Sequence, residues 1–120
     1  MPISMVALAS LTFVPRAAAD TADVLKAVAV QEANGAWRFT VTVSHPDDGW
    51  EHFADRWEVI GPDGEILGIR TLLHPHVEEQ PFVRSLGGID VPAGVSEVRI
   101  RANCSTDGLG GAEVTIRLEE

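Results

Sequence analysis

The sequence predicts an all-β fold, a seven-stranded antiparallel β-sandwich of the immunoglobulin or fibronectin type III kind. From position 23 onward, apolar and polar residues alternate in short runs, and no stretch shows a helical period of useful length. Turn signals such as Asn-Gly and Pro-Asp-Gly separate these runs at short intervals. Because 120 residues suffice for one hydrophobic core and are too few for two, we expect a single domain over residues 20–120.

The first half of this domain is expected to contain four strands. The first leads into Asn34-Gly35, a strong hairpin signal because both residue types tolerate the positive φ of a type I′ turn. Trp37 and Trp57 begin the next two strands and can fill the core, since one cysteine cannot supply the Cys–Trp–Cys framework of immunoglobulin domains. The strands are expected over residues 24–32, 37–44, from Trp57 onward, and 65–73.

The second half is expected to contain the remaining three strands. Phe82 opens the fifth, which we expect to loosen at Gly87-Gly88 because glycine weakens a strand interior. The sixth alternates apolar and basic residues up to Cys104, and a glycine-rich loop separates it from the last strand. These strands are expected over residues 82–86, 97–104 and 114–119.

The order of the strands predicts where the reactive side chains gather. In an antiparallel sandwich whose strands follow one another, successive connections alternate between the two ends of the domain. One end then receives the turns at 34–35, 62–64 and 92–94, which carry little chemistry. The opposite end receives every histidine and the only thiol. The residues expected at that end are His45, His52, His74, His76, Cys104 and Asp107.

This grouping of side chains indicates transition-metal binding, because imidazole, thiolate and carboxylate suit copper or zinc. Pro75 keeps the backbone between His74 and His76 extended, so these two imidazoles are the expected primary ligands. The alternative is that the histidines only pack in loops, Cys104 is a small buried apolar side chain, and Asp107 is a turn residue. His52 is expected as the third ligand, Asp107 or Cys104 as the fourth, His45 as a further candidate, and Glu78 and Glu79 as acceptors that orient the imidazoles.

An aromatic cluster in the same region supports a second hypothesis, a protein-binding module without metal. Trp50 and Phe53 flank His52, and an exposed tryptophan beside loops is a typical anchor for a partner. Trp50 is expected to be exposed, whereas Phe53 and Trp57 can equally cap the core.

The N-terminal segment has the pattern of a secretory signal. An apolar run over residues 3–14 precedes Ala17-Ala18-Ala19, which predicts a signal over residues 1–19 and cleavage before Asp20, although no basic residue precedes the run. Cleavage removes Arg16 and changes the formal charge from −9 to −10, because all 18 acidic residues follow the cut. We expect a periplasmic or secreted monomer without a membrane anchor. Such an acidic chain is expected to bind no nucleic acid.

The segments GWEHFADRW, at residues 49–57, and HPHVEEQPF, at 74–82, resemble a group of short exported proteins of proteobacteria. The resemblance covers nearly all of the chain after the signal; it implies export and no particular activity. In that group an aspartate is frequent near position 104 and a histidine near position 107. The resemblance therefore implies that this chain, with Cys104 and Asp107, has lost or rebuilt a ligand.

Catalytic motifs are missing from the sequence. It contains no G-x-S-x-G elbow, no H-E-x-x-H pair, no phosphate-binding loop and no G-x-G-x-x-G after a strand. We therefore expect a binding protein and not an enzyme.

Overall fold

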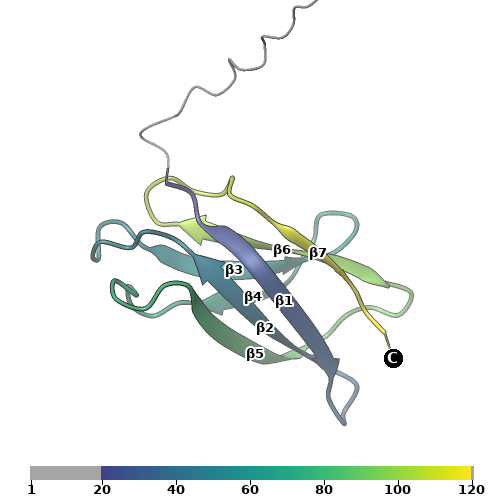
Figure 1. Ribbon diagram of the computed structural model, residues 1–120. Helices are drawn as coiled ribbons and strands as arrows, with labels where there is room; N and C mark the ends of the chain where they lie inside the picture. Colours follow the sequence, from purple (N-terminus) through teal and green to yellow (C-terminus); the bar gives the residue numbers. More distant parts are fainter. Residues whose placement is uncertain (1–19, 120) are drawn as a thin grey trace, which may run out of the picture.

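A computed structural model describes residues 20–119 and contains seven antiparallel strands in two facing sheets (Figure 1). The predicted β-sandwich is thereby confirmed, while the predicted signal at 1–19 lies outside the described residues. No helix in residues 20–119 is long and apolar enough to cross a membrane. The strands are β1 (Asp23–Gln31), β2 (Trp37–Ser44), β3 (Ala54–Ile60), β4 (Ile66–Thr71), β5 (Phe82–Ile89), β6 (Glu97–Cys104) and β7 (Val114–Arg117).

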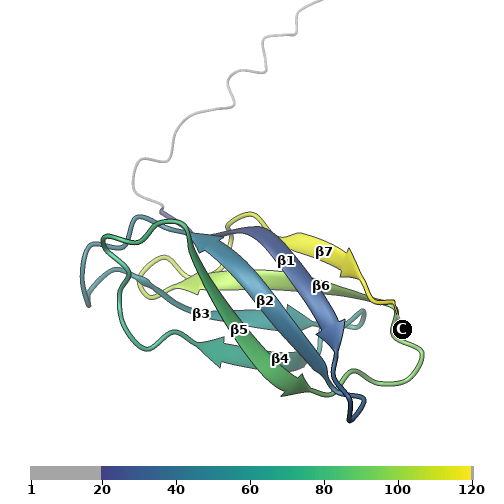
Figure 2. The same ribbon diagram turned by 60° about the horizontal axis from the view of Figure 1, so that its bottom comes forward.

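The two sheets have the strand orders β1-β2-β5 and β4-β3-β6-β7 (Figure 2). Alternate residues of each strand point between the sheets, because side chains in a strand have a period of two. Phe39 and Val41 of β2 face Trp57 and Val59 of β3 in this core, and all four side chains are fully buried. The centre of each sheet therefore supplies the centre of the core.

The first hairpin turn differs from the predicted type I′ turn. The Gly35 N–H donates to the Glu32 carbonyl at 2.9 Å, and the Glu32 N–H donates to Ala36 at 2.7 Å. Within this three-residue loop only Gly35 has a positive φ, 93°. Glycine adopts the left-handed region without steric strain, so Asn34 can keep a negative φ. The β3–β4 hairpin repeats the arrangement with Gly64 at φ 88°.

Two strand boundaries also differ from those expected. β3 begins at Ala54, three residues before Trp57, because Ala54 already pairs with Cys104 of β6. β5 continues through Gly87-Gly88 to Ile89, and the glycines form an irregularity in the pairing with β2 instead of an end. The alternation of core and surface residues along the strands was therefore predictable from the sequence, whereas the strand ends, which depend on pairing with a neighbouring strand, were not.

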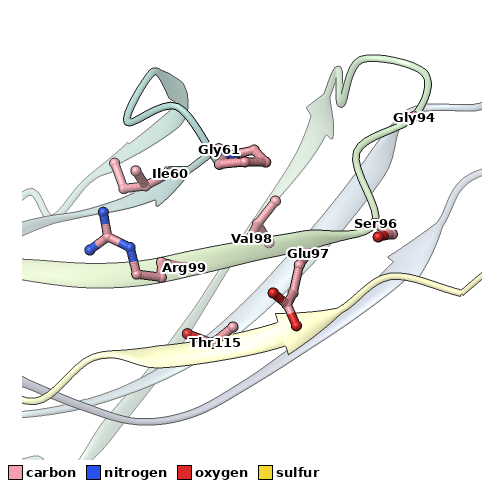
Figure 3. A pocket seen from close by; sticks show the side chains of 9 residues that line it. Ile60, Gly61, Gly94, Ser96, Glu97, Val98, Arg99 and Thr115 are labelled. Carbon is pink, nitrogen blue, oxygen red and sulfur yellow. The ribbon is translucent and has the colours of Figure 1, made fainter.

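The connections alternate between two ends of the sandwich, as expected. One end, which we call the far pole, holds the β1–β2, β3–β4 and β5–β6 connections. A cavity of ≈ 450 Å³ lies there between the β3–β4 turn at Gly61-Pro62 and Gly94 (Figure 3). The other end, the histidine pole, consists of residues 20–22, 45–53, 72–81 and 105–113.

The segment before β1 is locked against the β6–β7 connection at the histidine pole. Ala22 is fully buried, and the Val24 N–H donates to the Ala112 carbonyl at 2.8 Å. The Ala112 N–H in turn donates to the Asp23 carboxylate at 2.8 Å. The backbones approach so closely that a Cβ on Gly111 would lie 1.9 Å from the Ala22 carbonyl oxygen. Glycine at 111 therefore fixes where the chain enters the domain.

We predict that Gly111→Ala lowers the free energy of unfolding by roughly 2 to 3 kcal/mol, because the new methyl group collides with backbone that must move. Urea unfolding measures the loss. Gly61→Ala is the control, since its Cβ meets only the end of the exposed Glu65 side chain. Equal stability of the two variants would contradict the close contact.

Candidate metal centre

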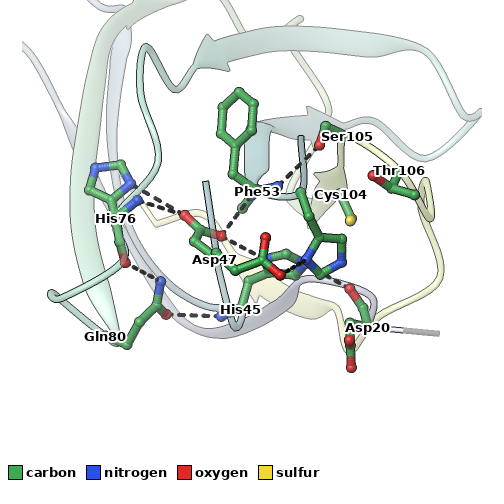
Figure 4. A network of polar contacts seen from close by, with 12 residues as sticks. Asp20, His45, Asp47, Phe53, His76, Gln80, Cys104, Ser105 and Thr106 are labelled. Carbon is green, nitrogen blue, oxygen red and sulfur yellow. Dashed lines mark hydrogen bonds and ion pairs between the residues drawn. The ribbon is translucent and has the colours of Figure 1, made fainter. Parts of the chain in front are cut away.

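The buried carboxylate of Asp47 joins three segments of the histidine pole (Figure 4). Its Oδ1 accepts hydrogen bonds from His45 Nδ1 at 2.5 Å and from the Ala54 N–H at 2.9 Å. Its Oδ2 accepts the His76 N–H at 2.7 Å. The Asp47 side chain is 0% exposed, so these donors replace the water that the carboxylate loses on folding. Asp47 thereby joins the end of β2 to the start of β3 and to the β4–β5 connection.

The His45 ring is held at both nitrogens. Asp47 fixes Nδ1, and Nε2 lies 2.7 Å from the carbonyl oxygen of Asp20. The His45 N–H also donates to the Gln80 side chain at 2.9 Å, which anchors the backbone beneath the ring. Both ring nitrogens therefore face oxygen atoms. A metal at Nε2 would replace the contact with Asp20 and keep the one with Asp47, an arrangement common among metal-binding histidines.

His52 lies beside His45 on the turn that follows Gly49. The two ring centroids are 4.7 Å apart. The turn is closed by the His52 N–H, which donates to the Gly49 carbonyl at 3.2 Å, and Gly49 has a φ of 141° that favours glycine. His52 Nε2 lies 3.4 Å from Asp107 Oδ2, whereas its buried Nδ1 has no hydrogen-bond partner. The ring therefore has spare capacity for a ligand.

Cys104 ends β6 with its side chain buried beside these imidazoles. Its Sγ accepts the Asp107 N–H at 3.3 Å and lies 3.9 Å from Asp107 Oδ2. A tight turn brings Asp107 back, since the backbones of Cys104 and Gly108 exchange hydrogen bonds of 3.0 and 2.8 Å. The hydrogen bond from the Asp20 N–H, reinforced by His52, holds the pKa of Asp107 below its usual value despite partial desolvation.

His45, His52 and Cys104 form the group within residues 20–119 that could hold a metal ion, with one potential ligand atom from each residue. These atoms all lie within 4.8 Å of one another. Nitrogen and sulfur ligands about 2.0 to 2.3 Å from one tetrahedral ion lie roughly 3.3 to 3.8 Å apart. Closing the site around an ion therefore needs side-chain movements on the order of 1 Å.

The structure places the expected primary ligands, His74 and His76, outside this group. Their ring centroids are 4.7 Å apart, so Pro75 does bring them together, but His76 lies on the other side of Asp47 from His45 (Figure 4). The His76 ring stacks on Phe82 at 3.9 Å, and neither ring nitrogen has a hydrogen-bond partner. Burial, followed by the charges of Arg84 and His74, lowers the pKa of His76.

Asp47 lies within the HPDDGWEHF loop and is a residue of the site that no sequence motif indicated. Glu78 and Glu79 were expected to orient the imidazoles, yet both are exposed and Glu79 lies 3.3 Å from Arg84. Asp47 performs that role for His45 instead. The only feature of the sequence that indicates Asp47 is its position two residues after His45. Asp48 lies only one residue farther along, so the sequence does not distinguish the two.

The aromatic side chains of this region differ in exposure, as the hypothesis of a protein-binding module required. Trp50 is 68% exposed and packs edge-on against the half-buried Phe53, with ring centroids 5.6 Å apart. Trp57 is fully buried in the core. Trp50 therefore stands free for contact with a partner.

Comparison with curated proteins finds a relative in the haloarchaeon Halomicrobium mukohataei, described as a "Putative lipoprotein". It is 42% identical over 93 residues, which are 77% of this chain and 45% of the relative. The chain thus spans less than half the length of that protein. No family model matches the chain, and no solved structure gives a significant match. The resemblance to proteobacterial exported proteins stays a prediction.

We predict that Asp47→Asn destabilises the protein by about 3 kcal/mol, because it replaces an acceptor of three hydrogen bonds by an amide. The amide NH₂ must face one of the buried N–H donors and leave it unpaired. Urea unfolding measures the loss. Asp48→Asn is the matched control, since that side chain is 73% exposed, and it is expected to change stability by less than about 0.5 kcal/mol. Similar losses in both variants would contradict the role of Asp47.

We predict a loss of stability on acidification that His76→Phe reduces. The folded pKa of His76 lies below its ordinary value of 6.5, so the unfolded chain binds the proton more readily. The contribution of His76 is therefore intact above pH 6.5 and is lost progressively as the pH falls from there toward the folded pKa. Phenylalanine can stack on Phe82 without titrating. Unfolding curves between about pH 7.5 and 5 give the comparison, and identical pH dependences would contradict the prediction.

Proposed function

We propose that this protein is a small exported binding domain that holds a copper- or zinc-like ion between His45, His52 and Cys104. Two imidazoles from the β2–β3 connection and a buried thiol from the end of β6 converge within 4.8 Å, and this convergence is the main support for the proposal. Imidazole and thiolate are the ligands that zinc and copper prefer in proteins. Asp107 is the proposed fourth ligand, since its Oδ2 lies near both His52 and Cys104.

The charge of the histidine pole supports a cation as the ligand. The histidine pole contains no lysine or arginine, so its electrostatic field attracts positive ions. It carries eight acidic residues: Asp20, Asp47, Asp48, Glu51, Glu78, Glu79, Asp107 and Glu113.

The composition of the site favours a closed four-coordinate centre over a blue-copper centre for electron transfer. Blue-copper sites combine two histidines and a cysteine with a weak axial ligand, usually methionine. The only methionines, Met1 and Met5, lie in the predicted signal. A carboxylate from Asp107 is a hard oxygen ligand that suits zinc better.

Export of the chain is supported by its predicted signal and by the description of its haloarchaeal relative as a lipoprotein. The same description weighs against our expectation of a protein without a membrane anchor, because lipoproteins are anchored through lipid. We propose a location outside the cytoplasm. A binding role without catalysis rests on the missing catalytic motifs.

A protein-binding module is the second candidate function, and the exposure of Trp50 favours it. Trp50 is joined at the histidine pole by Leu73, 72% exposed, and Val77, 53% exposed. Such apolar side chains beside acidic residues suit a basic protein surface with an apolar centre. This function would need no metal.

We predict that the mature chain without a histidine tag binds one zinc ion, and that Cys104→Ser or His52→Ala weakens binding about a hundredfold or more, because each removes a proposed ligand. Competition with a chromophoric chelator measures affinity, and cobalt in place of zinc reports the thiolate through its charge-transfer absorption.

His74→Ala and Trp50→Ala are the controls for this experiment, since both side chains are exposed and lie outside the three-ligand group. They are expected to bind zinc as the wild type does. A wild-type chain that binds neither zinc nor copper would refute the metal site and leave the protein-binding module. A larger loss in His74→Ala than in His52→Ala would refute the ligand assignment.

A further inference from the structure

The backbone of Asp20 lies across the proposed metal site. Its nitrogen donates to Asp107 Oδ2 at 3.1 Å, and its carbonyl oxygen lies 2.7 Å from His45 Nε2. Asp107 Oδ2 is also 3.4 Å from His52 Nε2. The backbone nitrogen of Asp20 thus contacts one proposed ligand, Asp107, and its carbonyl oxygen contacts another, His45. Figure 4 shows Asp20 beside His45 in this position.

The position of Asp20 is fixed by packing on its C-terminal side. Ala22, two residues later, is fully buried, and Gly111 leaves room for its carbonyl group. The Val24 N–H donates to Ala112 at 2.8 Å. These contacts anchor the chain two to four residues after Asp20, and the hydrogen bonds of Asp20 itself hold its backbone at the site.

The predicted cleavage of the signal changes the chemistry of that nitrogen. In the precursor the Asp20 nitrogen belongs to the Ala19–Asp20 amide, whose lone pair is delocalised into the carbonyl group and is a poor metal ligand. Hydrolysis of this bond by signal peptidase adds water across it. The Ala19 carbonyl becomes a carboxylate, and the Asp20 nitrogen becomes an α-amino group with a lone pair that can bind a metal.

We propose that signal removal creates a ligand of this site, the α-amino group of Asp20. The inference rests on the proposed function and refines it: the α-amino nitrogen takes the fourth position in place of Asp107, whose Oδ2 lies 3.1 Å from that nitrogen and accepts its hydrogen bond. With His45 Nε2 on the ion, the Asp20 carbonyl oxygen is released from that ring. The precursor then lacks the complete site, and full affinity for the ion arises only after export and processing.

The test uses two forms of the chain and zinc as the probe. One form begins at Asp20, and the other retains Ala19, which keeps a terminal charge but moves the amino group by up to about 3.6 Å. The form that begins at Asp20 is expected to bind zinc at least tenfold more tightly in chelator competition. Mass spectrometry of the exported protein checks that its first residue is Asp20.

Amine acetylation gives a second readout that needs no variant. Lys26 is the only lysine in the sequence and its side chain is exposed, so the mature chain offers one ε-amine as an internal control. Zinc is expected to protect the Asp20 α-amino group from an N-hydroxysuccinimide ester of acetic acid and to leave Lys26 labelling unchanged. Peptide mass spectrometry quantifies both positions.

Each outcome of these experiments bears on the inference. Tighter binding by the chain that begins at Asp20, together with selective protection of its amino group, supports it. Equal zinc affinities without protection would overturn it and leave the site of His45, His52 and Cys104 standing. Binding of neither zinc nor copper by either form would overturn the inference and the proposed function together. A native chain that starts elsewhere would overturn the inference alone.

Discussion

The carboxylate of Asp47 is the group on which the histidine pole depends. A buried carboxylate is costly unless donors replace its hydration, and here a histidine ring and two backbone N–H groups do so. The donors come from the end of β2, the start of β3 and the β4–β5 connection, which are far apart in the sequence. Satisfying this one charge therefore fixes three segments relative to each other and directs the outer nitrogen of His45 away from the core.

Asp47 also separates the four histidines into two pairs with different surroundings. The His76 ring is stacked on Phe82 and sealed from solvent, which suits a packing role at the end of the core. On the other side, His52 faces the thiol of Cys104 and the carboxylate of Asp107. The same residue type thus closes the core on one side of the carboxylate and offers metal ligands on the other. The surrounding acidic residues draw cations toward the second pair.

The sequence predicted the fold, because the alternation of apolar and polar residues and the turn signals are local features. It also predicted the end of the domain at which the histidines gather, because the order of antiparallel strands determines the end at which each connection lies. It could not predict how the histidines divide. His74 and His76 had the most distinctive local spacing, yet the stacking on Phe82 and the bond to Asp47 depend on contacts distant in sequence. Asp47 and Asp48 are adjacent and chemically identical, and only the fold distinguishes the buried residue from the exposed one. The turn at Asn34 was mispredicted for a similar reason, since loop length, and not residue type alone, decides which position takes a positive φ.

The most direct test of the proposed metal site is ¹⁵N NMR of the histidine side chains of the mature protein during zinc addition. One equivalent of zinc is expected to shift the Nε2 resonance of His45 and a ring nitrogen of His52, while the Nδ1–H proton of His45 stays hydrogen-bonded to Asp47. The rings of His74 and His76 should keep their resonances. Zinc-dependent shifts confined to His74 and His76, or loss of the His45 Nδ1–H proton on binding, would contradict it.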